Sequence, residues 1–156
     1  MRIVYKIKCM EGDNHMARLT NFIYCINAER VPSNEGNGES INAIGVLSAL
    51  TPEFVPGTFS FSIIFSVLDI DISANNTIQI IFSKKGEKKN LINSGVITIP
   101  PLPNDDEIGL PNEFKGLNMS MDFRNVIFET EGLYNTSIIF NGQLLADNSI
   151  YVKGKR

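Results

Sequence analysis

The sequence predicts an all-β protein, an antiparallel β-sandwich of about eight strands, and three observations support it. Apolar and polar residues alternate one by one in several segments, as expected for strands with one buried face. Gly, Pro and Asn residues separate these segments at short intervals, and no helical pattern alternates with them. No motif recurs at a fixed period, which argues against a propeller or a solenoid. An open, mixed β-barrel is the second architecture compatible with the pattern.

Composition limits the class of protein. The chain has 156 residues, a formal net charge of −3, and 43% hydrophobic and 20% charged residues. These values are typical of one globular domain whose core needs no metal or disulfide. They argue against a basic nucleic-acid binder and against wholesale disorder. No apolar run approaches the roughly 18 residues of a membrane span. The abundance of Ile, Asn and Lys, whose codons are AT-rich, indicates a low-GC bacterial or phage genome.

Two interpretations of residues 1–15 remain open. Codons for residues 11–16 can contain a ribosome-binding sequence in front of Met16, so residues 1–15 can be a mis-assigned leader and residues 16–156 the single domain. Alternatively, residues 1–15 include a strand, because Ile3 and Tyr5 alternate with charged residues. We favour the first interpretation, under which the chain loses its only histidine, His15.

The first half of the chain contains the clearest strand. Residues 22–30 and 41–50 are strand-like and flank a polar loop at residues 31–40. Residues 58–68 then alternate strictly, with aromatic and aliphatic side chains on one side and hydroxyl groups on the other. We expect Ile64 to be the single apolar side chain exposed on the outer face of this strand.

The middle of the chain supplies two more strands and the longest loop. Residues 77–84 and 91–99 are strand-like on either side of a charged turn around Gly86. Residues 100–116 contain four prolines and form the longest loop. The next strand begins at about residue 117.

The last third of the chain carries specific turn signals. Alternation changes parity near Asn125, which predicts a β-bulge. A second alternating segment ends at Asn141-Gly142, the pair that a type I′ hairpin turn requires. The side chains expected in the core are Phe59, Phe61, Phe65, Phe82, Phe123, Phe128, Tyr134, Ile138 and Phe140.

Tyr134 follows Gly132 at the start of the penultimate strand. This placement is typical of the tyrosine corner of immunoglobulin-like sandwiches, in which the hydroxyl bonds back to the backbone of the preceding turn. A core aromatic residue with its hydroxyl at the rim is the equal alternative. The predicted sandwich is therefore immunoglobulin-like or similar.

Three segments, residues 41–46, 128–134 and 138–142, resemble the pattern of a family of small bacterial proteins known only as a domain of unknown function. The resemblance extends over roughly residues 16–152. Its motifs are a glycine bend, a corner and a hairpin turn, so it implies a β-sandwich. It carries no catalytic residue over to this chain.

Patterns of catalytic chemistry are scarce. Without His15 the chain has no histidine base, and Cys25 lies among apolar neighbours, where a buried, inert thiol is expected. Residues 34–39 are Gly-rich but lack the lysine of a phosphate-binding loop. The spacing of Cys9 and Cys25 matches no zinc or redox motif, and no secretory signal is present, so we expect a cytoplasmic protein.

Two acidic clusters are candidates for a calcium site. Asp69 and Asp71 end the strand at residues 58–68 and would point the same way if the alternation continued. Asp105 and Asp106 lie in the proline-rich loop. Surface charge that maintains solubility is the favoured explanation for both clusters, and no cofactor is expected.

We therefore predict a non-enzymatic binding or scaffolding module that acts through protein–protein contacts, with the product of a neighbouring gene as a candidate partner. The alternatives are a calcium-dependent, membrane- or ligand-binding sandwich and a hydrolase that uses Asp69 and Asp71. The expected docking surface combines residues 31–40 and 100–116, with Ile108 and Leu110 as apolar anchors.

Basic residues gather at one turn, namely Lys84, Lys85, Lys88 and Lys89. They could contact nucleic acid or an anionic partner. We instead interpret them as a charged hairpin tip that maintains solubility and blocks edge pairing.

Overall fold

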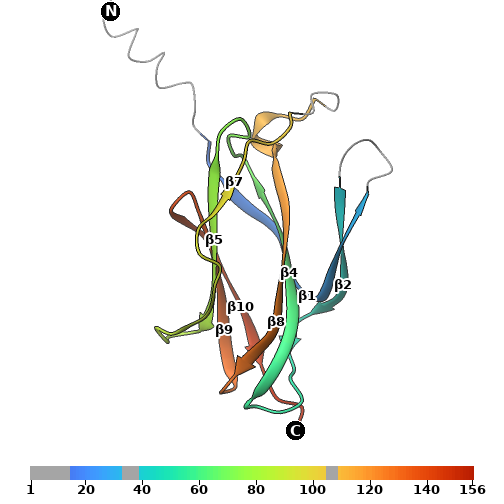
Figure 1. The fold of residues 1–156 in the computed structure, drawn as a ribbon, viewed down its shortest axis with the longest axis vertical. Helices are drawn as coiled ribbons and strands as arrows, with labels where there is room; N and C mark the ends of the chain where they lie inside the picture. The colour runs from blue at the N-terminus through green and yellow to red at the C-terminus, as the bar shows by residue number, and fades with distance from the viewer. Residues whose placement is uncertain (1–14, 33–38, 105–108) are drawn as a thin grey trace, which may run out of the picture.

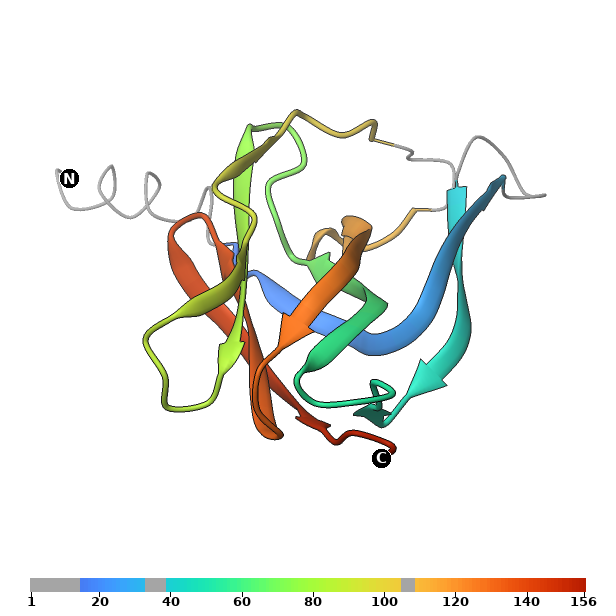
Figure 2. The ribbon, with the colours of Figure 1, turned by 60° about the horizontal axis from the view of Figure 1, so that its bottom comes forward.

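Two β-sheets pack face to face in the computed structural model, which describes residues 15–32, 39–104 and 109–156 (Figures 1 and 2). The four-stranded sheet has the order β2-β1-β4-β8, formed by Glu39–Leu47, Arg18–Pro32, Gly57–Leu68 and Gly116–Phe128. The second sheet has the order β3-β10-β9-β5-β6, formed by Ala49–Leu50, Gln143–Val152, Gly132–Phe140, Asn76–Lys84 and Asn90–Asn93. The short strand β7 (Ile97–Ile99) pairs with β5 beyond β6. The predicted β-sandwich is confirmed.

The strand count and the pairing differ from the prediction in detail. The described residues form ten strands rather than about eight, because residues 41–50 and 91–99 each divide into two. Residues 41–47 belong to β2, and the chain then crosses to the other sheet, where β3 pairs parallel with β10. The sandwich is therefore not wholly antiparallel. Within the described ranges, the one helical element is a single 3-10 turn, Asn112–Phe114.

Strand β4 lies between β1 and β8, and this position decides the burial of both of its faces. Phe61 and Phe65 on its inner face are fully buried as predicted. The expectation that Ile64 is exposed is wrong, since it is 8% exposed. Ile64 lies opposite Ile23 of β1 and Ser120 of β8, and these flanking strands cover it.

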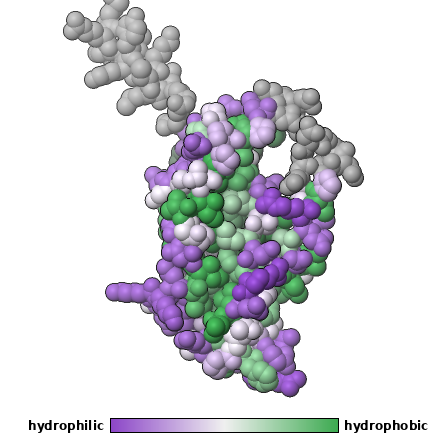
Figure 3. Space-filling view, viewed as in Figure 1, coloured by the Kyte–Doolittle hydropathy of each residue, from purple (hydrophilic) through white to green (hydrophobic). Residues whose placement is uncertain are grey.

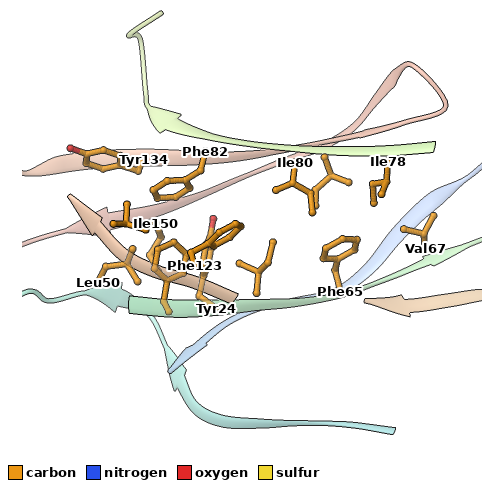
Figure 4. Close-up of a cluster of buried hydrophobic side chains, with 14 of the residues drawn as sticks. Tyr24, Leu50, Phe65, Val67, Ile78, Ile80, Phe82, Phe123, Tyr134 and Ile150 are labelled. Atoms are coloured by element: carbon orange, nitrogen blue, oxygen red, sulfur yellow. The ribbon is translucent and has the colours of Figure 1, made fainter. Parts of the chain in front are cut away.

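The core is built from aromatic rings of both sheets (Figure 4). Eight of the nine predicted core side chains are buried, and Phe59 is half-buried. Phe61 of β4 packs against Phe82 of β5 with ring centroids 5.4 Å apart and against Phe123 of β8 at 5.2 Å. Tilted and edge-on ring pairs of this kind add about 0.5–1.5 kcal/mol to the burial energy. The Phe61–Phe82 pair joins the two sheets, because β4 and β5 belong to different sheets.

Two turn predictions are confirmed at the level of single residues, and the structure decides between the two alternatives for Tyr134. Asn125 has φ 53° in a bulge opposite Ser60, whose hydroxyl oxygen accepts the Asn125 N–H at 2.9 Å. Asn141 and Gly142 both have positive φ, as a type I′ turn requires. Tyr134 donates its hydroxyl hydrogen bond to the carbonyl of Thr130 at 2.7 Å, which is the tyrosine-corner geometry.

Candidate functional site

A pocket of about 260 Å³ opens at the end of the sandwich where β4 finishes and β8 begins, the upper end in Figure 1. Polar groups reach it from Asn104, Lys115 and Asn118. Its apolar side chains are Leu68, Ile72, Leu102, Leu110, Phe114 and Leu117. Small-molecule and peptide sites commonly combine an apolar lining with a few polar groups in this way.

Backbone hydrogen bonds hold the loops around this pocket. The N–H of Leu102 donates to the carbonyl of Ile72 at 2.8 Å, and the N–H of Asp69 donates to the carbonyl of Lys115 at 3.0 Å. Gly116 is required at the first position of β8, because a Cβ there would lie 1.9 Å from the carbonyl oxygen of Val67. The pocket therefore rests on a backbone with little freedom.

Two apolar side chains project at the mouth of the pocket. Leu110 is 47% exposed and Phe114 is 49% exposed. The guanidinium of Arg18 lies 4.9 Å from the centroid of the Phe114 ring, a cation–π contact that orients the ring. Lys115 donates from Nζ to Asn104 Oδ1 at 3.0 Å, which connects the two ends of the proline-rich loop.

Leu110 was predicted as an anchor, whereas Phe114 was not. The proline-rich loop was interpreted as irregular, and its only local signal for order is the sequence Pro111-Asn112 before Glu113-Phe114. The 3-10 turn there, closed by the N–H of Phe114 to the carbonyl of Pro111 at 2.9 Å, sets the ring beside the pocket. The second predicted anchor, Ile108, lies outside the described residues.

The segments that flank the two predicted docking loops lie toward the same end of the molecule. The ends of β1 and β2 and the ends of the proline-rich loop all lie at the upper side in Figures 1 and 2. Most of the loop at residues 31–40 falls outside the described residues.

The expected alternation from Asp69 to Asp71 is absent, because β4 ends at Leu68 and Asp69 takes a φ of 60°. Asp69 accepts the N–H of Met16 at 3.2 Å and lies 3.4 Å from His15 Nδ1. Asp71 accepts the hydroxyl and the N–H of Ser73, and these hydrogen bonds hold the pKa of Asp71 below its usual value. Asp69 is thus engaged by the segment that precedes β1, and Asp71 by a local turn contact with Ser73.

The remaining metal candidates, Asp105 and Asp106, lie outside the described residues. Within the part of the chain that the structure describes, no group of three or more His, Cys, Asp or Glu side chains could hold a metal ion. Cys25 is fully buried, as predicted, and burial raises the pKa of its thiol. A protonated, inaccessible thiol is a poor nucleophile.

Comparisons with known proteins add a structural neighbour. No protein-family model matches the sequence, and no curated protein matches it. The sandwich is similar to the crystal structure of an immunoglobulin-like protein from Pseudomonas aeruginosa, with 11% identity, a TM-score of 0.42, and coverage of 91% of this chain and 100% of that one. Among the described residues, no helix has the length and apolar character needed to cross a membrane. The strand pairing itself establishes that this chain is a β-sandwich.

Proposed function

We propose that the protein is a non-enzymatic binding module that holds another protein at the pocket beside the proline-rich loop. The observation that carries the proposal is the pairing of two half-exposed anchors, Leu110 and Phe114, with an apolar pocket of about 260 Å³. Catalysis would need convergent reactive groups, whereas Asp69, Asp71 and Cys25 are engaged or buried.

The energetics favour a docking role for this surface. Full burial of a Leu or Phe side chain stabilises a complex by about 1.5–3 kcal/mol relative to exposure. Prolines in the loop reduce the entropy lost when a partner orders it. Binding energy in protein interfaces concentrates in a few such anchors at the centre of a pocket.

A pair of matched variants tests the proposal. Wild-type protein and the double variant Leu110→Ser/Phe114→Ser are immobilised and compared for capture of the product of the neighbouring gene. We expect the double variant to lose at least about tenfold in affinity. Val96→Ser is the control. Val96 is 68% exposed, immediately precedes β7 and does not line the pocket.

Thermal melting of each variant shows that the fold is retained. If the double variant captures the partner as well as the wild type does, the proline-rich loop is only a connector.

The proposal includes a bacterial cytoplasmic location, which cell fractionation tests.

A further inference from the structure

A second groove lies between the edge strands of the two sheets, away from the pocket described above. Strand β8 ends the four-stranded sheet and β6 ends the other, and within the described residues each pairs with one neighbour. Lys89 to Ile92 and Arg124 to Ile127, with Glu129, enclose a cavity of about 380 Å³ between them. We call this the β6–β8 groove. A cavity of about 60 Å³ continues from it toward Tyr134.

The floor of the β6–β8 groove is apolar. Leu91 and Ile92 are half-buried, and Ile127 is 59% exposed although it sits in a regular strand. On this face Figure 3 shows hydrophobic surface (green) between hydrophilic side chains (purple) on either side. Edge strands also present unpaired N–H and C=O groups, which an extended peptide can use.

The rim of the groove is positive in a protein whose net charge is −3. Lys84 from the end of β5, Lys89 and Arg124 line the groove and its continuation, against two glutamates, Glu87 and Glu129, and Lys85 and Lys88 belong to the adjoining β5–β6 turn. The salt contacts of Lys89 with Glu129, of Lys84 with Glu87 and of Arg124 with Asp122 span 3.9, 4.0 and 3.6 Å between exposed or partly exposed side chains, so they are weak. Solubility explains charged side chains at a turn, but it does not explain the apolar floor beside them.

We propose that the β6–β8 groove binds an extended protein segment in which acidic and apolar residues alternate. A strand placed along the edge directs alternate side chains to opposite sides. Its apolar side chains would contact Leu91, Ile92 and Ile127, and its carboxylates would meet the lysines and Arg124. This charge complementarity selects an acidic segment.

A peptide fits the groove better than a nucleic acid does. Single-stranded nucleic acids bind through exposed aromatic rings that stack on bases. The one ring that lines this region, Tyr134, is 2% exposed and its hydroxyl is bonded to Thr130. With the β5–β6 turn at the lower left of Figure 1 and the first pocket at the upper end, the module could hold two segments at once.

The test uses a fluorescein-labelled peptide of about eight residues that alternates Glu or Asp with Ile or Val. Fluorescence anisotropy measures its affinity for the full-length protein. We expect saturable binding that is at least about tenfold tighter than that of the same peptide with Lys in place of the acidic residues. Lys88→Glu/Lys89→Glu should weaken binding about tenfold and Ile127→Ser about fivefold.

Two variants serve as matched controls. Leu144→Ser removes an apolar side chain that is 60% exposed at another hairpin, and Lys155→Glu reverses an exposed charge near the C-terminus. Both should keep the wild-type affinity within about twofold. Leu110→Ser/Phe114→Ser should also leave it unchanged, which separates this groove from the proposed partner site.

Each other result overturns the proposal. Equal binding of the acidic and basic peptides, or no binding at about 1 mM, removes the groove as an acidic-segment site. If Lys88→Glu/Lys89→Glu weakens peptide binding but Ile127→Ser does not, the peptide binds the charged turn alone and not the apolar groove. Tighter binding of an oligothymidylate than of the peptide assigns the surface to nucleic acid instead.

Discussion

The hydroxyl of Tyr24 joins the two sheets inside the core. Tyr24 Oη lies 2.7 Å from Thr136 Oγ1 and donates to the carbonyl of Asn148 at 3.1 Å, and both partners belong to the opposite sheet. Buried polar groups need such partners, because an unmet hydrogen bond costs about 1–3 kcal/mol. Tyr24 thus adds two hydrogen bonds between the sheets to the apolar packing of the core.

Burial raises the pKa of Tyr24 from its ordinary value of 10.0 to about 12. The folded state therefore keeps a proton that the unfolded state releases above pH 10. The contribution of the protonated Tyr24 to stability is complete below pH 10. It is lost as the pH rises toward 12, and the free energy of unfolding then falls by up to about 3 kcal/mol. Urea unfolding between pH 9 and about 11.5 should show this loss in the wild type and a smaller loss in Tyr24→Phe.

A control accompanies that measurement. Tyr151→Phe serves as the control variant, because Tyr151 is 51% exposed and its replacement leaves the core intact. Identical curves for Tyr24→Phe and the wild type would contradict a buried, protonated Tyr24.

Phe61 is fully buried and contacts aromatic rings from three other strands. Phe61→Ala should lower the free energy of unfolding by about 3–5 kcal/mol, because it leaves a cavity that the packed sheets cannot fill. Phe123→Ala should behave alike. Phe54 is 55% exposed, so Phe54→Ala should change stability by less than about 0.5 kcal/mol. Wild-type melting of both core variants would mean that the inner face is assigned wrongly.

At the scale of elements, close backbone approach matters as much as side-chain pattern. Strand β8 begins at Gly116, where Val67 and Leu68 of β4 leave no room for a Cβ. The pairing of these strands positions Leu117 and Phe114 at the candidate site. The sequence placed the start of the strand correctly, within a residue, but offered no sign that Gly116 was obligatory.

Gly116→Ala should therefore push β8 away from β4 and lower stability by more than about 2 kcal/mol. Gly86→Ala is the matched control: Gly86 has φ +84° and open space around it, so the cost should be about 1–2 kcal/mol from the backbone alone. Chemical denaturation measures both. A cost for Gly116→Ala no larger than that for Gly86→Ala would refute the close approach.

At the scale of the whole molecule, we propose that residues 16–156 are the folding unit. Before Met16 the structure describes His15, whose Nδ1 lies 3.4 Å from Asp69 Oδ1, and a partly exposed pair of this kind contributes at most about 1 kcal/mol. A chain that starts at Met16 would place its α-ammonium group 3.2 Å from Asp69 Oδ2. We expect its melting temperature to stay within about 5 °C of that of the full chain. A drop of more than about 10 °C would make residues 1–15 part of the fold.

Calcium provides a second test on the whole molecule. A site that binds only the folded state must raise the melting temperature. Asp69 and Asp71 are already engaged by Met16 and Ser73, so millimolar calcium should produce no shift. A rise of several degrees, absent in Asp69→Asn/Asp71→Asn, would restore the calcium-dependent alternative.

Local pattern was enough to predict the β class, the aromatic core, the bulge near Asn125 and the hairpin at Asn141-Gly142, and it offered the corner at Tyr134 as one of two equal alternatives. Each depends on period-two alternation or on the backbone angles of one or two residues, which neighbouring residues determine. The burial of Ile64, the parallel pairing of β3 with β10 and the bond from Tyr24 to Thr136 could not be predicted in this way.

The same distinction applies to the candidate site, because some of its features follow from local sequence and others from strand order. The proline-rich loop and Leu110 were visible in the sequence, because prolines and apolar residues in a long loop are local features. The pocket, the place of Phe114 beside Arg18 and the β6–β8 groove depend on which strands end each sheet. Strand order joins residues far apart in the chain, and hydrophobic alternation is the same whichever strand lies alongside, so only the tertiary structure decided it.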